Sequence, residues 1–279
     1  MPELPEVETI CRGLTMSLQG AKILKVEARR SGLRFEFPND LKSKLEGRIF
    51  VQMRRRSKYI LIDLDDGNSL ILHLGMSGRL LIAKPNDPVA KHDHVLIECE
   101  KEKSLRFNDP RRFGVLDIYP TEHLMNHRLL KNLGVEALSS DLTLQYLKAM
   151  FTSKKTTIKV ALLDQRIIAG LGNIYVCEAL FWAGISPERS AQTLIEKEIE
   201  ALIVAIVNVL NAALKAGGSS LRDYVQSDGE QGGFQHQFAV YNREGQHCPR
   251  CKESTSLTPC IKRITQAGRS TFYCSYKQV

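Results

Sequence analysis

Apolar and polar residues alternate along short segments between residues 21 and 119, the pattern of β-strands buried on one face. Turn signals such as Asp66-Gly67 and Asn86-Asp87-Pro88 separate these segments. Their spacing predicts an antiparallel β-sandwich. The candidate strands are residues 21–30, 48–56, 59–66, 69–74, 94–100 and 114–119.

Helical periodicity flanks this region. At the N-terminus, Pro5 suits the first turn of a helix, and Gly20 ends a stripe formed by Val7, Ile10, Cys11, Leu14 and Leu18. Beyond about residue 140, further helices are expected at 142–151, 157–163, 173–183 and 193–216. For the last of these, Thr193 and Glu196 form a potential capping box, and Gly217-Gly218 ends the pattern.

The C-terminal residues from 235 onward have little apolar content and two β-like stretches among cysteines. The sequence therefore predicts an α+β protein: a helix and an antiparallel β-sandwich over residues 1–138, a helical domain over 139–234, and a small β-hairpin ribbon over 235–279.

Composition narrows the class of protein. The 279 residues are 43% hydrophobic and 25% charged, which excludes a disordered or fibrous chain. No stretch approaches the roughly 18 apolar residues of a membrane helix, so no membrane partner is expected. Acids stand where a signal peptide needs basic and then apolar residues, which favours a cytoplasmic protein.

The charge of the chain points to a polyanionic partner. The formal net charge is +8, and residues 235–279 alone carry seven Lys or Arg against two acids. Further basic runs occupy residues 54–58 and 154–159. A solvated basic face is the simpler explanation of such a charge, but the clustering favours nucleic acid.

The N-terminus offers an unusual nucleophile. Removal of Met1 before the small residue Pro2 would leave a free secondary amine just ahead of a helix, where the macrodipole disfavours protonation. Such an amine can attack a sugar aldehyde carbon, and the resulting iminium is an electron sink for elimination. The adjoining acids Glu3, Glu6 and Glu8 have a simpler explanation, because acids are common at helix N-termini.

Several motifs in chain order resemble the formamidopyrimidine-DNA glycosylases. The string from Pro2 to Thr9 resembles the N-terminus of that family more than that of the endonuclease VIII group, which usually has glycine where Leu4 stands. The other matching segments are residues 55–59, 73–78, 91–95, 109–114, 170–175, 226–229 and 268–274.

This resemblance implies a role for each matching residue. Pro2 is expected to be the nucleophile, Glu3 the general acid/base, with Glu6 in support, and Lys58 a catalytic lysine. Arg269, on the ribbon turn, is expected near the lesion phosphate and in the second elimination. The helical domain is expected to contain a helix–two-turns–helix element.

An enzyme that extrudes a base must fill the gap in the stack. An unbranched apolar side chain, a guanidinium and an aromatic ring suit that task, and Met76, Arg111 and Phe113 supply them. Core packing is the alternative for Met76 and Phe113, although Met76 lies between glycines in a predicted loop.

Four further residues are candidate DNA-binding residues, together with Arg111. Lys154 and Lys159 are interpreted as phosphate contacts, with exposed solubilising lysines as the alternative. Asn173 begins a helix whose backbone N–H groups can meet phosphate, and a plain N-cap is equally compatible. His92 forms either a metal pair with His94 or, as the resemblance implies, a phosphate contact.

The seven cysteines suggest a structural zinc site. Cys11, Cys99 and Cys177 lie in apolar patterns and are expected in the core. Cys248 and Cys251 form a half-site, and Cys274 is a third ligand. The resemblance implies a second Cys-x-x-Cys pair, but Lys277 occupies the fourth position. Cys260 or His247 could replace that ligand, and a metal-free ribbon is also possible.

The sequence thus predicts a bifunctional DNA glycosylase and AP lyase of base excision repair. It would act as a monomer on double-stranded DNA that contains oxidised purines, near the nucleoid. Two alternatives remain: an endonuclease VIII-type enzyme for oxidised pyrimidines, and an inactive module that binds damaged DNA. The glycine-rich segment 227–239 is expected to close over the base.

Overall fold

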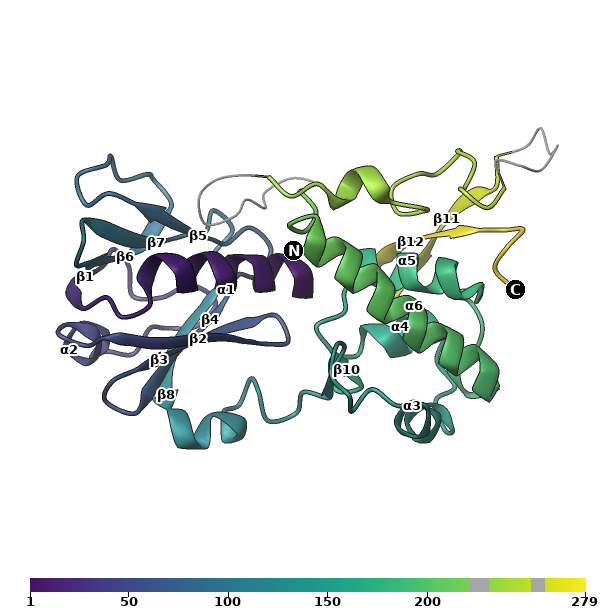
Figure 1. The fold of residues 1–279 in the computed structure, drawn as a ribbon, viewed down its shortest axis with the longest axis horizontal. Coiled ribbons are helices and arrows are strands. Elements are labelled where there is room, and N and C mark those ends of the chain that lie inside the picture. The colour runs from purple at the N-terminus through teal and green to yellow at the C-terminus, as the bar shows by residue number, and fades with distance from the viewer. Residues whose placement is uncertain (221–230, 252–258) are drawn as a thin grey trace. The chain divides into compact units, whose positions relative to one another are not determined.

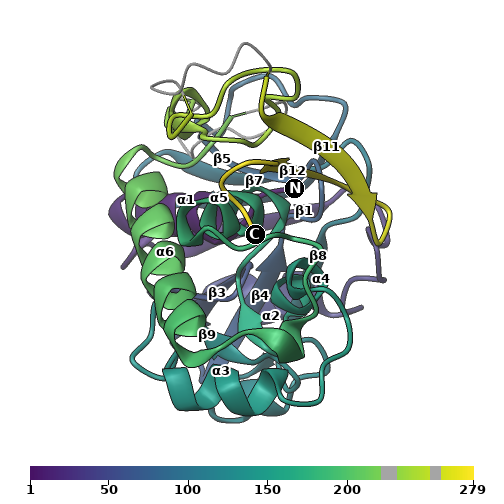
Figure 2. The ribbon, with the colours of Figure 1, turned by 90° about the vertical axis from the view of Figure 1, so that its right-hand side faces the viewer.

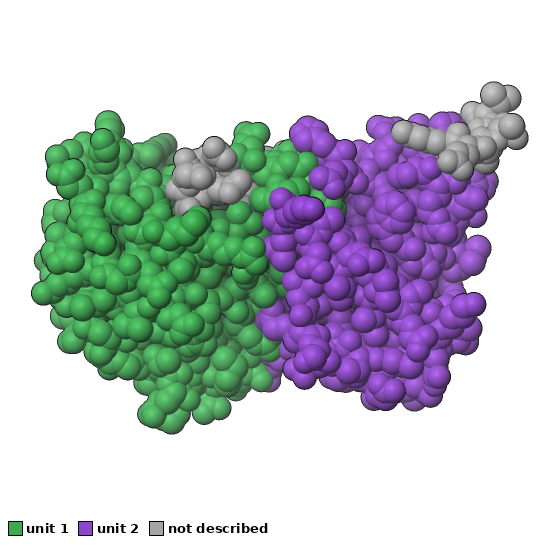
Figure 3. Space-filling model, in the orientation of Figure 1, with its two compact units in different colours: residues 1–131, 216–235 green, residues 132–215, 236–279 purple. Residues whose placement is uncertain are grey.

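The computed structural model describes residues 1–220, 231–251 and 259–279 (Figure 1). The chain divides into two compact units, residues 1–131 with 216–235 and residues 132–215 with 236–279 (Figure 3). The helices and the ribbon thus share one unit, and the three-domain division with boundaries at 138 and 234 stays a prediction. The motif 226–229 lies outside the described residues, as does the first part of segment 227–239.

The first unit is built on an antiparallel β-sandwich, as predicted. One sheet has the order β1-β6-β7-β5 and the other β2-β3-β4-β8. The sandwich contains two strands, β5 and β7, that the alternation pattern did not indicate. The strands are β1 (Ile23–Ala28), β2 (Phe50–Arg56), β3 (Tyr59–Leu64), β4 (Asn68–His73), β5 (Arg79–Ala83), β6 (Asp93–Cys99), β7 (Lys103–Asn108) and β8 (Val115–Pro120).

Helix α1 (Leu4–Leu18) lies along the sandwich between its two sheets (Figure 1). The predicted apolar stripe is buried in the same hydrophobic cluster as residues from both sheets, so the helix closes the core. Gly20 follows the helix with a φ of +78°. The short helices α2 (Leu41–Leu45) and η1 (Thr121–Asn126) complete the elements before residue 131.

The second unit is mainly helical. The elements of this unit up to residue 215 are β9 (Val135–Glu136), α3 (Leu144–Phe151), α4 (Ile158–Leu163), β10 (Ile168–Ala169), α5 (Asn173–Ala183), η2 (Ala191–Thr193) and α6 (Glu196–Lys215). Helix α5 is buried on nearly every side, and α6 packs alongside it (Figure 2).

The start of the longest helix corrects a prediction. Helix α6 begins at Glu196 rather than at residue 193, because residues 191–193 form a 3-10 turn. The predicted capping box does not form: Thr193 Oγ1 donates to the carbonyl of Ser190, and Glu196 pairs with Lys148. The carboxylate of Glu198 accepts from the backbone N–H of Ile195 instead, at 2.9 Å.

The C-terminal ribbon consists of β11 (Ile261–Gln266) and β12 (Arg269–Cys274), preceded in the chain by η3 (Phe234–Gln237). Ala267 and Gly268, both at positive φ, form the two-residue turn of this hairpin. A small cluster that includes Phe181 of α5 and Phe272 of β12 joins the ribbon to the helices. Among the described residues, no helix is long and apolar enough to cross a membrane.

Candidate active site and zinc centre

The N-terminal turn brings Pro2 and two carboxylates together. Pro2, Glu3 and Glu6 are all buried, and Glu3 is the N-cap of α1. The capping box is reciprocal: the backbone N–H of Glu3 donates to Glu6 Oε2 at 2.9 Å, and the side chain of Glu3 accepts from the N–H of Glu6. Helix capping therefore explains part of the acid cluster, and the cap fixes the backbone next to Pro2.

Glu6 also binds a distant segment. Its Oε1 accepts hydrogen bonds from the backbone N–H and the hydroxyl of Ser219, at 2.7 and 3.0 Å. At the neighbouring Gly218, with φ at +81°, an added Cβ would lie 3.0 Å from this oxygen. The sequence offered no signal for this contact, because 213 residues separate Glu6 from Ser219.

Lys58 lies in the tight turn between β2 and β3, where Ser57 has a φ of +56°. The side chain of Arg55 holds this turn, donating to the carbonyl of Ser57 at 3.0 Å and to Glu8 Oε2 at 2.9 Å. Lys58 is only 6% exposed. Glu8 therefore connects the first turns of α1 to the turn that carries the predicted catalytic lysine.

His73, at the end of β4, is kept neutral. Burial, followed by the nearby charge of Lys58, lowers its pKa to about 4. Its Nδ1 accepts from the backbone N–H of Gly75 at 3.0 Å, and its ring lies 4.7 Å from that of Tyr59. At neutral pH the imidazole therefore adds no charge beside Lys58, and Nε2 carries the proton.

The three predicted gap-filling residues all protrude from the protein. Met76 is 40% and Phe113 is 44% exposed, and Arg111 is exposed with its guanidinium 5.1 Å from the ring centre of Phe113. Core packing, the alternative interpretation of Met76 and Phe113, is therefore wrong. An apolar tip, an aromatic ring and a cation stand on neighbouring loops of the same unit.

His92 and His94 do not form a metal pair. His94 is buried, and its Nε2 donates to the carbonyl of Asp109 at 2.9 Å. His92 is partly exposed just before β6, with its ring 6.1 Å from that of His94. Only His92 is thus exposed enough to meet a phosphate.

The structure corrects the interpretation of Lys159. This lysine is completely buried, and its ammonium donates to Thr271 Oγ1 at 2.6 Å and to the carbonyl of Ser270 at 3.3 Å. A direct phosphate contact is therefore excluded in this conformation, since the charge stabilises strand β12 from within. Lys154 is partly exposed, with its ammonium 3.8 Å from Asp164.

Asn173 and Arg269 both lie near the ribbon turn, Asn173 partly buried and Arg269 exposed. Asn173 is the first residue of α5, with Gly172 as the N-cap, so the plain N-cap alternative is wrong. Its Nδ2 donates to the carbonyl of Ser270 at 2.8 Å. Arg269, one residue earlier on β12, is exposed.

Glu178 is a buried residue of α5 whose role the sequence patterns did not indicate. Its carboxylate accepts from the backbone N–H groups of Ala239, Val240 and Tyr241, at 2.8 to 3.0 Å. Burial raises its pKa, although these three hydrogen bonds oppose the rise. A lone acid in an otherwise apolar helix was the available signal.

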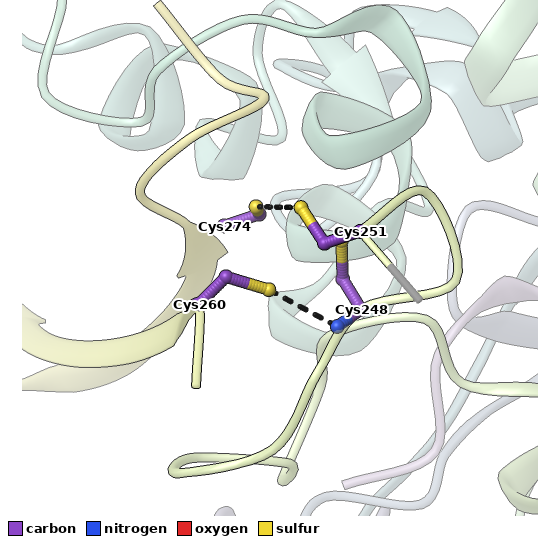
Figure 4. Close-up of side chains that lie close together, drawn as sticks. All are labelled: Cys248, Cys251, Cys260 and Cys274. Atoms are coloured by element: carbon purple, nitrogen blue, oxygen red, sulfur yellow. Dashed lines mark hydrogen bonds between the residues drawn. The ribbon is translucent and has the colours of Figure 1, made fainter. Parts of the chain in front are cut away.

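Four cysteines converge at the base of the ribbon, with their sulfurs directed toward one another (Figure 4). Cys248, Cys251, Cys260 and Cys274 are all buried, and their Sγ atoms lie within 4.8 Å of one another. Cys260 immediately precedes β11, whose first residue, Ile261, pairs with Cys274. Cross-strand pairing thus places these two thiols at the same end of the hairpin.

The cluster fits a structural zinc ion. Four thiolates at about 2.3 Å from a tetrahedral zinc would stand about 3.8 Å apart, and the sulfurs of Cys251 and Cys274 are 3.7 Å apart. The backbone N–H of Cys248 donates to the sulfur of Cys260 at 3.1 Å, a bond that stabilises a thiolate. Cys260 therefore supplies the fourth thiol of a set that would hold zinc, and His247 does not belong to the cluster found among the described residues.

Comparisons with known proteins agree over the whole chain. Two family descriptions match, the formamidopyrimidine-DNA glycosylase N-terminal domain over residues 1–116 and the formamidopyrimidine-DNA glycosylase H2TH domain over 133–225. The formamidopyrimidine-DNA glycosylase of Gluconobacter oxydans is 51% identical, and that of Ruegeria sp. (strain TM1040) is 49% identical. Each alignment covers 98% of both chains. The chain belongs to the formamidopyrimidine-DNA glycosylase family.

Solved structures of this glycosylase family show the same fold. A variant of the Lactococcus lactis enzyme bound to DNA containing Fapy-dG has a TM-score of 0.91 and 35% identity, covering 99% of both chains. The same enzyme in complex with abasic-site DNA has a TM-score of 0.90, 34% identity and full coverage of both chains. The predicted fold class, with a helical domain and a zinc-ribbon-like hairpin, is thereby confirmed.

The ribbon of this glycosylase departs from the pattern that the family resemblance implied. A second Cys-x-x-Cys pair was expected, but Lys277 stands where its last cysteine would be. The structure supplies the missing thiol from the other strand, since Cys260 precedes β11 while Cys274 ends β12. Four thiols that fit a zinc ion are thus retained, with one of them from a different position in the chain.

Proposed function

We propose that this glycosylase is a bifunctional DNA glycosylase and AP lyase of base excision repair. It removes oxidised purines, such as 8-oxoguanine and formamidopyrimidines, from double-stranded DNA and cuts the strand by β,δ-elimination. The observation that carries this function is Pro2 beside the buried carboxylates of Glu3 and Glu6, at the head of a helix closed by a reciprocal capping box.

Covalent chemistry begins at the N-terminal amine. After removal of Met1, the nitrogen lone pair of Pro2 attacks C1′ of the damaged nucleotide, and the bond from C1′ to the base breaks. The departing base takes up a proton, and the sugar ring opens to give an iminium at Pro2. This cation acidifies C2′, so loss of a C2′ proton expels the 3′ phosphate, and a second elimination expels the 5′ phosphate.

Glu3 and Lys58 act on the protons and charges of these steps. Glu3, buried next to Pro2, exchanges protons with the sugar. Lys58 brings its positive charge to a backbone phosphate and assists elimination, with the neighbouring His73 kept neutral by its lowered pKa. Arg269, exposed at the ribbon turn, contacts the lesion phosphate and promotes the second elimination.

Recognition of DNA divides into gap filling and phosphate binding. Met76, Arg111 and Phe113 enter the stack when the damaged base is extruded, and their exposure leaves them accessible to DNA. His92, Lys154 and the N-terminus of α5 at Asn173 bind phosphates along the strand.

With chromosomal DNA as substrate, the enzyme would work at the nucleoid in the cytoplasm, as a monomer.

Choice of the damaged base is the finer part of this proposal. Leu4, in place of the glycine typical of the endonuclease VIII group, favours oxidised purines. One solved structure holds Lactococcus lactis Fpg in complex with DNA that contains an oxidised pyrimidine, and that protein is 34% identical to this chain with a TM-score of 0.90. Oxidised pyrimidines are therefore the substrates with which oxidised purines must be compared. Excision of 8-oxoguanine should be faster than excision of an oxidised pyrimidine from the same duplex.

Borohydride trapping tests the covalent mechanism. The protein and an 8-oxoguanine duplex, mixed with borohydride, should form a covalent adduct whose linked peptide begins at Pro2. An otherwise identical protein with an N-terminal extension should bind the duplex but form no adduct, because its Pro2 nitrogen is an amide. A cross-link at Lys58 would refute the role of Pro2. Binding of damaged DNA without an adduct or strand cleavage would favour the inactive binding module.

A further inference from the structure

The loops that carry the gap-filling residues leave the sandwich side by side. Residues 74–78 follow β4 and carry Met76, whereas residues 109–114 precede β8 and carry Arg111 and Phe113. Strands β4 and β8 pair antiparallel, with His73 opposite Val115. The end of β4 and the start of β8 therefore meet at one edge of the sheet, and we call residues 74–78 and 109–114 the wedge loops.

The backbones of the wedge loops touch. A Cβ added to Gly75 would lie 2.5 Å from the carbonyl carbon of Phe113 and 2.6 Å from its oxygen. Gly75 also has a φ of +61°, where side chains are disfavoured. Only glycine allows an approach this close, so the tips of the two loops stand at a fixed separation.

Two buried polar side chains hold this contact together. The hydroxyl of Ser77 donates to Asp109 Oδ1 at 2.6 Å and accepts from the backbone N–H of Arg111 at 3.1 Å. Asp109 Oδ2 accepts from the backbone N–H of Gly114 at 2.7 Å. Asp109 is fully buried and Ser77 is 3% exposed, so water does not compete for these bonds. We call this arrangement the Ser77–Asp109 clasp.

The clasp is itself anchored in the other sheet. The backbone N–H of Asp109 donates to the carbonyl of His92 at 3.0 Å, and the carbonyl of Asp109 accepts from His94 Nε2 at 2.9 Å. His94 belongs to β6. Asp109 therefore connects both wedge loops, which adjoin β4 and β8, to strand β6 of the other sheet.

We infer that Ser77 and Asp109 are positioning residues that hold the wedge loops rigid, so that the enzyme can open the DNA stack. This inference rests on the proposed function. Extruding a base costs a few kcal/mol, and a wedge that must first become ordered loses part of its binding energy to that ordering. Because the clasp orders the tips before DNA arrives, it promotes base extrusion and not the later chemistry at the sugar.

Two substrates separate these steps. An 8-oxoguanine duplex requires extrusion and gap filling, whereas a single-stranded oligonucleotide with an abasic site has no stack to open. The measurement is the single-turnover cleavage rate on each substrate. For Ser77→Ala, we expect the ratio of the duplex rate to the single-strand rate to fall about tenfold, because a buried hydrogen bond to a charged group is lost.

A matched control exists in the same sandwich. The hydroxyl of Ser69, on β4, donates to Asp63, and both residues lie outside the wedge loops. Ser69 is fully buried, so Ser69→Ala removes a similar serine–aspartate bond. The rate ratio of this variant should stay within about twofold of the wild-type ratio, since the wedge loops keep their own hydrogen bonds.

A double-mutant cycle with Asp109→Asn tests the pair. The asparagine amide nitrogen cannot accept a hydrogen bond, so one of the two donors loses its acceptor. The two substitutions should therefore lower the rate ratio by less than the product of their separate effects. An unchanged ratio in Ser77→Ala, equal losses on both substrates, or independent effects in the cycle would overturn the inference. Failure of the wild-type protein to form an adduct at Pro2 would instead reject the proposed function.

Discussion

Two turns in different units each present an arginine to solvent, and they are stabilised by different means. Arg111 stands on a wedge loop fastened by one serine and one aspartate to a sandwich with a large apolar core. Arg269 stands on a ribbon whose cluster includes four cysteines and only a few apolar side chains. Where burial of apolar surface is extensive, hydrogen bonds suffice to position a loop. Where it is small, a metal ion held by the four cysteines would supply the missing stability.

Loss of zinc should have the largest effect and should act on the ribbon alone. Cys260→Ser should release the metal, because a structural site needs all four ligands and metal binding contributes about 10–16 kcal/mol in small zinc modules. We expect less than one zinc per chain by elemental analysis, rapid proteolysis within residues 236–279, and weaker DNA binding. The β-sandwich should keep its protection against proteolysis.

Cys99→Ala is the control for this variant. Cys99 is a buried core thiol outside the cluster, with its pKa raised to about 12 by burial, and its loss should leave the zinc content unchanged. Adding Lys277→Cys to Cys260→Ser should restore the metal, because position 277 completes a Cys-x-x-Cys pair with Cys274. Full zinc content in Cys260→Ser itself would disprove the assignment of the fourth ligand.

Lys159 offers a second way to loosen the ribbon without touching the metal. Lys159→Met should lower the free energy of unfolding of its unit by about 3 kcal/mol, because Thr271 and the carbonyl of Ser270 lose a buried charged donor. Thermal and denaturant unfolding measure this change, with Lys154→Met as the partly exposed control. If both variants were equally stable, the buried ammonium would have no structural role.

In the first unit, we expect the free energy of unfolding to depend on pH through His73. Its pKa falls from 6.5 in the unfolded chain to about 4 in the folded one, so the unfolded state binds more protons between these values. Stability is therefore fully present above pH 6.5 and is lost as the pH falls. At pH 5, His73 should lower the free energy of unfolding by about 2 kcal/mol relative to pH 7.5.

Replacing the histidine isolates this contribution. His73→Asn retains an acceptor for the N–H of Gly75 and should flatten the pH profile of stability between pH 4 and 6.5. His123→Asn, at an exposed histidine of η1, is the matched control and should keep the wild-type slope. Identical slopes in the two variants would show that His73 is not the titrating group.

The smallest effects concern the salt dependence of DNA binding. Arg269→Gln and Lys154→Gln should each reduce the slope of log affinity against log salt by about one unit, because each removes one phosphate contact. Lys159→Gln should leave the slope unchanged, because the ammonium of Lys159 is buried and donates to Thr271 of the ribbon instead of to a phosphate. A reduced slope for Lys159→Gln at a temperature where its ribbon is still folded would show that this lysine reaches phosphate after all, and that the ribbon opens on binding DNA.

Local features of the chain were predictable from the sequence. The stripe from Val7 to Leu18 and the alternating strands each reflect a period that one element imposes on its own residues. The segment at 173–183 is apolar on nearly every side, which indicates a fully buried helix. The same holds for motifs within one turn, such as Pro2 and Glu3 at a helix start or Cys248 and Cys251 in one knuckle. Chemistry confined to a few neighbouring residues leaves its signature in the spacing.

What only the tertiary structure decided were contacts between residues far apart in the chain. The sequence does not distinguish a lysine that is exposed to solvent, such as Lys155, from one that is buried and donates a hydrogen bond to Thr271, as Lys159 does. The choice of Cys260 as fourth ligand depends on strand register, and the clasp between Ser77 and Asp109 on the pairing of β4 with β8. Burial and partner geometry arise from packing, and no local period encodes which distant element will supply the partner.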